Sequence, residues 1–159
     1  MKILDISAGN RAIWFDKKYP DATYIDVRPE VAPDMVADAR ELPAALGTGF
    51  DLIVFDPPHK NNTGQNMAKN YGAWTHAQIR DIIVGSAKEA HRVTKDDGLM
   101  ALKWNDHSLR LATILKMIDQ WWEPLFGHGV THQQRHGSAT SWVMLRRRKV
   151  GIPELRLSA

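Results

Sequence analysis

The chain of 159 residues contains no cysteine. That absence excludes disulfide bonds, cysteine-ligated metals and thiolate nucleophiles. No apolar run approaches the roughly 20 residues that a membrane-spanning helix needs. The chain begins Met-Lys-Ile-Leu-Asp, which reaches a carboxylate too early for a secretory signal. We therefore expect a cytoplasmic protein.

Glycine is scarce where a phosphate-binding loop would need it. The loop expected after the first strand, residues 7–10, holds Gly9 alone and is followed by Arg11. A dinucleotide site of the Gly-x-Gly-x-x-Gly type and a P-loop both need more glycines in such a loop. One glycine still lets the backbone approach a ligand closely, so a ligand without phosphates fits this loop better.

Composition is otherwise that of one ordinary globular domain. Hydrophobic residues make up 43% and charged residues 25% of the chain, and we expect one domain over residues 1–149 with a tail over 150–159. The net charge is +3, and basic residues gather near the end: Arg135, Arg146, Arg147, Arg148, Lys149 and Arg156. This basic end suits a phosphate backbone but equally suits a solvated strand end and tail.

Hydrophobic patterning predicts strands that alternate with helices. Strands are expected over residues 2–6, 22–27, 35–37, 50–55, 99–104, 125–131 and 140–147. Helices are expected over residues 11–18, 41–46, 74–93 and 108–121, with Thr75 as an N-cap and a turn at 95–98. This order predicts an α/β fold with a mainly parallel sheet, helices on both faces and a closing antiparallel hairpin.

One stretch, residues 50–59, concentrates the chemistry. Its apolar strand ends at Asp56, and Pro57 and Pro58 cannot continue a strand because each lacks an N–H and fixes φ. Asp56 should therefore stand at the carboxyl end of a central strand, where open α/β sheets bind ligands. Its carboxylate and a rigidly held carbonyl could both accept hydrogen bonds from one amino group.

Three more carboxylates end the preceding strands: Asp5, Asp26 and Asp38. Asp26 follows Asp5 by 21 residues, close to the separation expected between a first βα turn and a ribose-binding acid. A carboxylate at that position can accept both ribose hydroxyl hydrogens.

The ordered set of these motifs resembles the Rossmann-like, S-adenosylmethionine-dependent amino-methyltransferases over roughly residues 2–104. Residues 56–59 resemble their Asp-Pro-Pro-aromatic motif, with His59 in the aromatic place, and residues 4–10, 24–30 and 37–39 resemble the three cofactor motifs. The stretch from 89 to 99 resembles the helix, turn and strand that follow. Arg11 departs from the family's final glycine.

The resemblance implies a methyltransferase fold, the cofactor S-adenosylmethionine and a set of site residues. Asp56 and the Pro57 carbonyl would hold the target amino group, with Pro58 stiffening the loop and His59 stacking on the base. The implied cofactor residues are Asp5, Ser7, Ala8, Gly9, Asn10, Asp26, Val27, Asp38 and Ala39. The acceptor would be an exocyclic amino group of a DNA or RNA base; adenine N6 is favoured, with guanine N2 and cytosine N4 open.

We expect no separate recognition domain within these 159 residues. Nucleic-acid recognition is expected from the 59–72 loop, the 127–140 connection, the basic end or a partner subunit; the candidate substrate-binding residues are Lys60, Asn61, Asn62, Lys69, Arg146 and Arg148. Two other classes remain open: a methyltransferase acting on a protein or small molecule, and a non-catalytic subunit that binds nucleic acid.

The histidines His128, His132 and His136 are spaced by four residues. Helical spacing would suit a metal, but the surrounding glycines and the expected hairpin favour solvated or substrate-facing imidazoles, so no metal is predicted. The tryptophans are expected in the core and at its rim rather than as base platforms.

Overall fold

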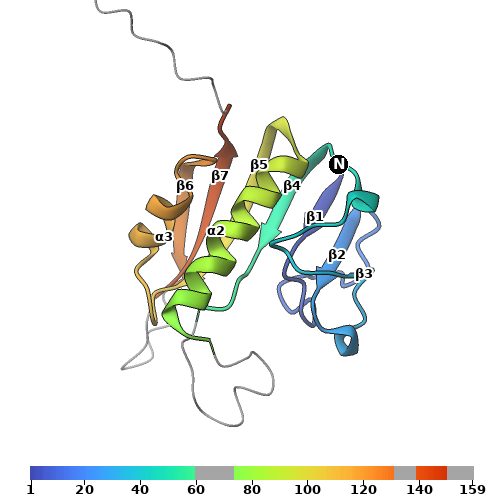
Figure 1. Ribbon diagram of the computed structural model, residues 1–159, viewed down its shortest axis with the longest axis horizontal. Coiled ribbons are helices and arrows are strands. Elements are labelled where there is room, and N and C mark those ends of the chain that lie inside the picture. The colour runs from blue at the N-terminus through green and yellow to red at the C-terminus, as the bar shows by residue number, and fades with distance from the viewer. Residues whose placement is uncertain (60–73, 131–138, 150–159) are drawn as a thin grey trace, which may run out of the picture.

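The computed structural model describes residues 1–59, 74–130 and 139–149. Seven strands form one sheet in the order β3-β2-β1-β4-β5-β7-β6 (Figure 1). The strands are β1 (Ile3–Asp5), β2 (Ala22–Asp26), β3 (Met35–Val36), β4 (Phe50–Phe55), β5 (Thr94–Asn105), β6 (Trp122–Val130) and β7 (Thr140–Arg147). The helices are α2 (His76–Val93), α3 (Leu111–Ile118) and two 3₁₀ turns, η1 (Pro29–Val31) and η2 (Ala44–Leu46).

Strand directions confirm the predicted sheet. Strands β1 to β5 pair in parallel, whereas β7 pairs antiparallel with both β5 and β6. The carboxyl ends of the parallel strands therefore lie at one edge, at the bottom of Figure 1. This edge is where ligands bind in open α/β sheets, and β4 lies at its centre.

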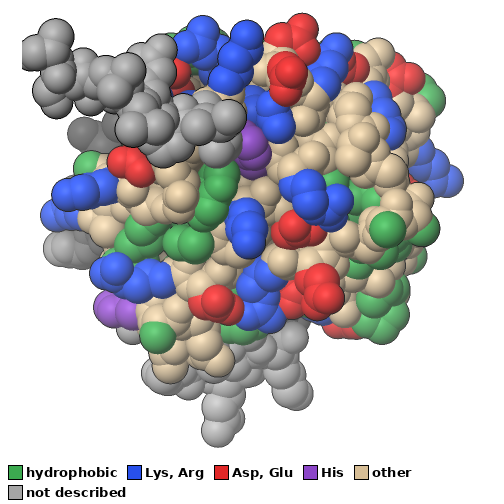
Figure 2. Space-filling view, turned by 45° about the horizontal axis from the view of Figure 1, so that its top comes forward, with side chains coloured by type: hydrophobic (Ala, Val, Ile, Leu, Met, Phe, Trp, Pro, Cys, Tyr) green, Lys and Arg blue, Asp and Glu red, His purple; other side chains and the backbone are tan. Residues whose placement is uncertain are grey.

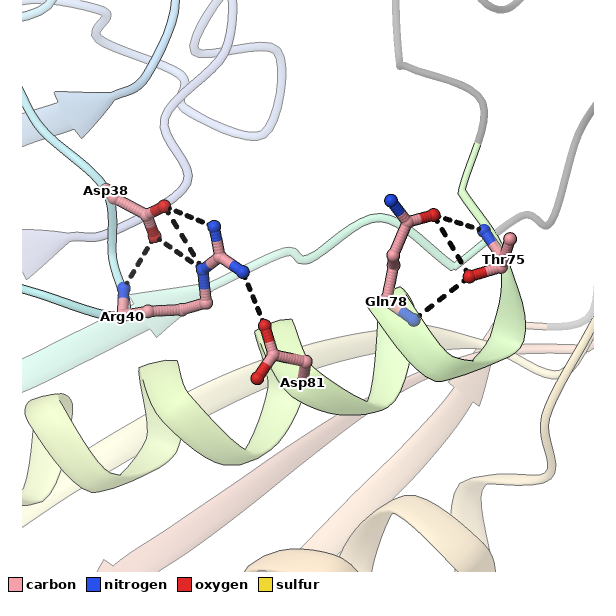
Figure 3. Close-up of polar contacts among 5 residues, drawn as sticks. All are labelled: Asp38, Arg40, Thr75, Gln78 and Asp81. Atoms are coloured by element: carbon pink, nitrogen blue, oxygen red, sulfur yellow. Dashed lines mark hydrogen bonds and ion pairs between the residues drawn. The ribbon is translucent and has the colours of Figure 1, made fainter.

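Helix α2 begins where its capping signal predicted. The Thr75 side chain accepts a hydrogen bond from the Gln78 N–H, and the Gln78 side chain accepts one from the Thr75 N–H at 2.9 Å (Figure 3). This reciprocal capping box satisfies two donors at the start of the helix. Ile79 and Ile83 lie one turn apart on its buried face, which holds α2 on the sheet.

The core lies between the sheet and the two α-helices, which contact each other. Trp104 of β5 and Trp122 of β6 are fully buried there. Their indole N–H groups donate to the carbonyls of Leu109 and Ala87, each at 2.9 Å, so neither ring leaves a donor unpaired. The predicted place of these two tryptophans in the core is confirmed.

The helix expected over residues 11–18 is wrong, because this segment forms successive turns. Gly9 and Arg11 have φ of 50° and 55°, and a left-handed backbone at that point cannot start a right-handed helix. Ile13, Trp14 and Phe15 are also consecutive and give no single apolar helical face. In the described ranges both α-helices lie on the same side of the sheet (Figure 1), so the expected helical cover of the second face is not found there.

Other predicted boundaries shift by a few residues. The helix expected over 41–46 is reduced to the three residues of η2, and the one expected over 108–121 to α3. The expected turn at 95–98 lies inside β5 as an irregularity, since Phe50 pairs with Thr94 but Leu52 pairs with Leu99. Gly98 permits it: an added Cβ would lie 2.2 Å from Thr94 Cγ2.

Within residues 1–59, 74–130 and 139–149, neither α-helix has the length and apolarity that a membrane span requires.

Candidate active site

Three carboxylates end the neighbouring strands β2, β1 and β4 at the same edge of the sheet. Asp5 and Asp26 are the last residues of β1 and β2, and Asp56 directly follows β4. Their side chains are close enough that the charges of Asp26 and Asp56 act on the ionisation of Asp5. The strand-end acids expected from the sequence are therefore brought together.

Asp5 is fully buried and organises the loop that follows it. Its two carboxylate oxygens accept hydrogen bonds from the Ser7 N–H at 3.1 Å and the Trp14 indole N–H at 2.8 Å. Burial, with a smaller contribution from the charges of Asp56 and Asp26, raises the pKa of Asp5 to about 6 despite these bonds. The buried Asp5 carboxylate thus fixes the position of the loop that follows β1.

The loop over residues 7–10 links the strand ends. The Ser7 hydroxyl accepts a hydrogen bond from the Asp56 N–H at 2.7 Å, and the Gly9 N–H donates to Asp26 Oδ2 at 2.8 Å. The Ala8 N–H donates to the Ile25 carbonyl of β2. One short loop therefore sets the position of Asp56 relative to Asp26, while Asn10 is exposed beyond it.

Asp26 is nearly buried and heavily hydrogen-bonded. Besides the bond from Gly9, it accepts bonds at 3.0 Å from both the backbone N–H and the side-chain Nε of Arg28. Burial raises the pKa of Asp26, but the Arg28 and Gly9 bonds outweigh burial and hold it below its ordinary value. The guanidinium also lies over the loop, because a Cβ on Gly9 would be 3.3 Å from Arg28 Nη2.

Asp38 follows β3 and is bound to Arg40. The Arg40 backbone N–H donates to Asp38 Oδ1 at 2.8 Å, and the guanidinium bridges Asp38 to Asp81 of α2 (Figure 3). The Arg40 hydrogen bonds hold the pKa of Asp38 below its ordinary value. This bridge attaches the loop after β3 to the helix, while Ala39 packs against the core.

Asp56 is paired with a residue that sequence reasoning did not select. The ammonium of Lys103 on β5 lies 2.7 Å from Asp56 Oδ2. Phe55 of β4 pairs with Leu102 of β5, so Asp56 and Lys103 are the next neighbours across the two strands. Pro57 is buried beside them, which restricts the loop that carries the carboxylate.

His59 lies against the core rather than projecting alone into solvent. Its ring is half-buried and meets Trp104 edge to face, with the ring centroids 6.2 Å apart. An imidazole held by a fully buried tryptophan has a restricted orientation.

Arg146 and Arg148 lie at the other edge of the sheet. Arg146 pairs with Leu99 of β5, four residues before Lys103, which places it about 13 Å along the strand toward the opposite edge. Both arginines form ion pairs with Glu123, at 3.0 and 3.8 Å. Figure 2 brings this edge forward and shows basic and acidic side chains intermixed on it.

Several predicted residues fall outside the described ranges. Lys60, Asn61, Asn62 and Lys69 belong to the segment 60–73, His132 and His136 to the segment 131–138, and the tail begins at residue 150. His128 is exposed on β6, where it pairs across the strands with Trp142 of β7.

Sequence reasoning missed the partners of the acids more than the acids themselves. Lys103 left a signal, because it is the single charged residue in the apolar run 99–104 of β5, and such a charge is normally paired. Trp14 and Arg28 left no comparable signal. Their contacts with Asp5 and Asp26 depend on loop conformations that no residue pattern specifies.

The chain resembles known proteins in structure but not in sequence. No family model matches the sequence, and no curated protein does. The N-methyltransferase NodS from Bradyrhizobium japonicum WM9, solved in complex with S-adenosyl-L-homocysteine, is similar at 14% identity, with a TM-score of 0.64 over 93% of this chain and 78% of that one.

Two further solved structures show the range of proteins with this fold. An rRNA methylase from Streptococcus thermophilus is 10% identical, with a TM-score of 0.59 over 92% of this chain and 87% of that one. The [4+2]-cyclase SpnF is 12% identical, with a TM-score of 0.62 over 94% of this chain and 75% of that one.

The fold is that of the class I methyltransferases. At identities of 10 to 14%, the likeness shows a shared fold and nothing more. The chemistry must therefore be argued from the residues at the carboxyl edge of the sheet.

Proposed function

We propose that the protein transfers a methyl group from S-adenosylmethionine to an exocyclic amino group of a nucleic-acid base, with adenine N6 the favoured acceptor. One observation carries the proposal: Asp56, at the end of the central strand, is hydrogen-bonded through its N–H to Ser7 of the loop that reaches Asp26. A single loop thus couples an acid suited to an amino acceptor with an acid suited to a ribose.

The residues at the ends of β1 and β2 fit the proposed cofactor. Gly9 has φ of 50° and no side chain, so a ligand could approach its backbone closely once the Arg28 guanidinium that lies over the loop moved aside. Asp26 offers a carboxylate to two ribose hydroxyls, and the adjacent Val27 is 55% exposed, which provides an apolar surface for a flat ring. The absence of a phosphate-binding loop agrees with a ligand that carries no phosphate.

The chemistry asked of the protein is positioning and charge. S-adenosylmethionine would supply a methyl group on a cationic sulfur: the S–CH₃ bond would break with its electron pair left on S-adenosylhomocysteine, the N–CH₃ bond would form, and the nitrogen would release one proton to solvent. Asp56 and the Pro57 carbonyl would accept hydrogen bonds from the amino group and orient its lone pair. The Asp56 charge would also stabilise the positive charge that develops on nitrogen.

Support for a nucleic-acid acceptor comes from three sources. The motif 56–59 resembles that of enzymes that methylate bases, an rRNA methylase shares the fold, and the half-buried His59 ring lies three residues from Asp56, where it could stack on a base. A base in a duplex would first have to be flipped out. Arg146 and Arg148 are proposed to contact phosphates far from the target base, because they lie at the opposite edge.

The test is an acceptor screen. The protein is incubated with methyl-labelled S-adenosylmethionine and separate pools of DNA, total RNA and protein, and the labelled nucleoside is identified by mass spectrometry. We expect N6-methyladenine in DNA or RNA. Label in the protein pool alone would favour a protein acceptor, and no label in any pool despite cofactor binding would favour a non-catalytic subunit.

A further inference from the structure

The ion pair between Lys103 and Asp56 is poorly explained as a stabilising contact. Its two side chains are only 26% and 22% exposed, and an ion pair largely withdrawn from water gains little net stability, because the cost of desolvating both charges offsets their attraction. Leu102 and Trp104, on either side of Lys103 in β5, are fully buried on the opposite face of the sheet, whereas Lys103 lies on the half-exposed face, where packing does not require a charge. The position of the charge, beside the proposed acceptor acid, suggests a role toward the acceptor.

We propose that Lys103 is a specificity-determining residue that donates a hydrogen bond to the ring nitrogen next to the target amino group. Asp56 and Lys103 would then bind the N–C–NH₂ edge of adenine, N1 and N6 together, and would reject the Watson–Crick edge of guanine. This inference rests on the proposed function and specifies its substrate class.

The chemistry of the pair selects this edge. Asp56 accepts hydrogen bonds and the adjacent ammonium donates three, of which one goes to Asp56 Oδ2. Adenine presents an N6 donor beside the N1 acceptor, which matches that order, as do N4 and N3 of cytosine. Guanine presents two donors, N1–H and N2–H. The Lys103 ammonium would then face the N1–H, and neither of these two donors would have an acceptor. Guanine has an acceptor beside its amino group only at N3, which lies next to the sugar.

The surroundings of Lys103 suit a flat heteroaromatic ring. Lys103 pairs across the sheet with Trp142 of β7, and Trp142 pairs with His128 of β6. Side chains that are directly opposite in neighbouring strands lie on the same face. Trp142 is half-buried and His128 is exposed. Lys103 therefore lies between the end of β4, which carries Asp56, and Trp142 of β7, and its side chain shares a face of the sheet with that of Trp142.

The test combines substitutions in the protein with substitutions in the acceptor base. The acceptors are short single-stranded DNA and RNA oligonucleotides whose central base is adenine, 1-deazaadenine or 7-deazaadenine, within random flanks of cytosine, guanine and thymine or uracil. The proteins are wild type, Lys103→Met, Lys103→Arg and a control, Lys116→Met, which removes an exposed lysine from α3. Methylated nucleosides give kcat/KM, fluorescence anisotropy with S-adenosylhomocysteine present gives oligonucleotide affinity, and thermal melting checks that each variant is folded.

The wild type and Lys116→Met should prefer adenine over 1-deazaadenine by about 10-fold or more in kcat/KM, the scale of one hydrogen bond to a charged group. They should treat 7-deazaadenine like adenine and leave guanine unmethylated. Lys103→Met should lose most of the preference and weaken binding of the adenine oligonucleotide, whereas Lys103→Arg should keep part of both.

Two results would overturn the inference while leaving the proposed function intact: adenine methylation by wild type without discrimination against 1-deazaadenine, or full discrimination by folded Lys103→Met. Methylation of guanine by wild type would overturn it as well. No transfer to any oligonucleotide would overturn the proposed function and this inference together.

Discussion

The backbone N–H of Asp56 lies 2.7 Å from the hydroxyl oxygen of Ser7 and donates a hydrogen bond to it. This bond joins the end of β4 to the loop that follows β1. The same loop donates to Asp26 from Gly9, so the proposed acceptor acid and the proposed ribose acid are two hydrogen bonds apart. A shift of either strand end would reach the other.

Ser7→Ala removes the acceptor for the Asp56 N–H and leaves that donor without its partner. We expect a loss of about 1–3 kcal/mol in transition-state stabilisation, the cost of an unsatisfied polar group, seen mainly in kcat. Steady-state kinetics measure the loss in kcat, and calorimetric titration with S-adenosylmethionine measures whether cofactor affinity changes. A variant that lost cofactor affinity while its kcat was unchanged would show that Ser7 serves the cofactor instead.

Asp26→Ala should weaken cofactor binding by about 1.5–3 kcal/mol, the range for hydrogen bonds that involve a charge. Arg28→Met should have the opposite effect, because the carboxylate must exchange its Arg28 bonds for ribose hydroxyls. Calorimetric titration of both variants with S-adenosylmethionine tests the two expectations. Unchanged affinity in Asp26→Ala would remove this acid from the cofactor site, and weaker binding in Arg28→Met would show that the arginine positions Asp26.

Asp5 should make stability depend on pH in the direction opposite to most native carboxylates. Burial raises its folded pKa to about 6 from 3.8, so the folded state holds this proton more tightly than the unfolded chain. Its contribution is fully present below pH 3.8 and is lost as pH rises through about 6, a change on the order of 3 kcal/mol.

Urea unfolding between pH 4 and 7 measures this contribution as the difference between wild type and Asp5→Asn. The wild type should gain stability relative to the variant as pH falls. Asp119→Asn, at an exposed position after α3, is the matched control for the loss of one carboxylate. A difference for Asp5→Asn that stays constant across this range would show that Asp5 titrates normally.

Arg146 and Arg148 are expected to contribute to nucleic-acid affinity through phosphates. Binding should weaken with salt with a slope of about −0.7 to −0.9 for each phosphate neutralised. The Arg146→Gln, Arg148→Gln variant should flatten that slope while leaving kcat unchanged, because both residues lie at the edge opposite Asp56. An unaltered slope would mean that their ion pairs with Glu123 are their only role.

Most of the sheet could be predicted because its information is local. The β7 bounds match residue for residue, and α2 starts at the predicted cap, Thr75. Apolar alternation and capping chemistry act over a few residues and are legible in the sequence. The segment 11–18 was mispredicted because its conformation is set by distant partners: Trp14 donates to Asp5, and Arg11 donates to the Ala32 carbonyl.

In the site, likewise, the residues at the strand ends could be predicted, whereas their side-chain partners could not. Asp5, Asp26 and Asp56 could be placed at one edge because parallel strands share their carboxyl ends. Their partners could not, since the pairing of Lys103 with Asp56 depends on the β4–β5 register. Register is set by packing across the sheet rather than by either strand alone.

The measurement that tests the account most directly compares Asp56→Asn with wild type in two assays, S-adenosylmethionine affinity and methyl transfer to nucleic acid. Asparagine can accept one hydrogen bond but lacks the charge that stabilises a developing ammonium. Cofactor affinity should be nearly unchanged while turnover falls about 10²–10³-fold, the scale of one preorganised electrostatic contact. Wild-type turnover in Asp56→Asn, and in Asp56→Ala beside it, would contradict the assignment of this strand end as the active site.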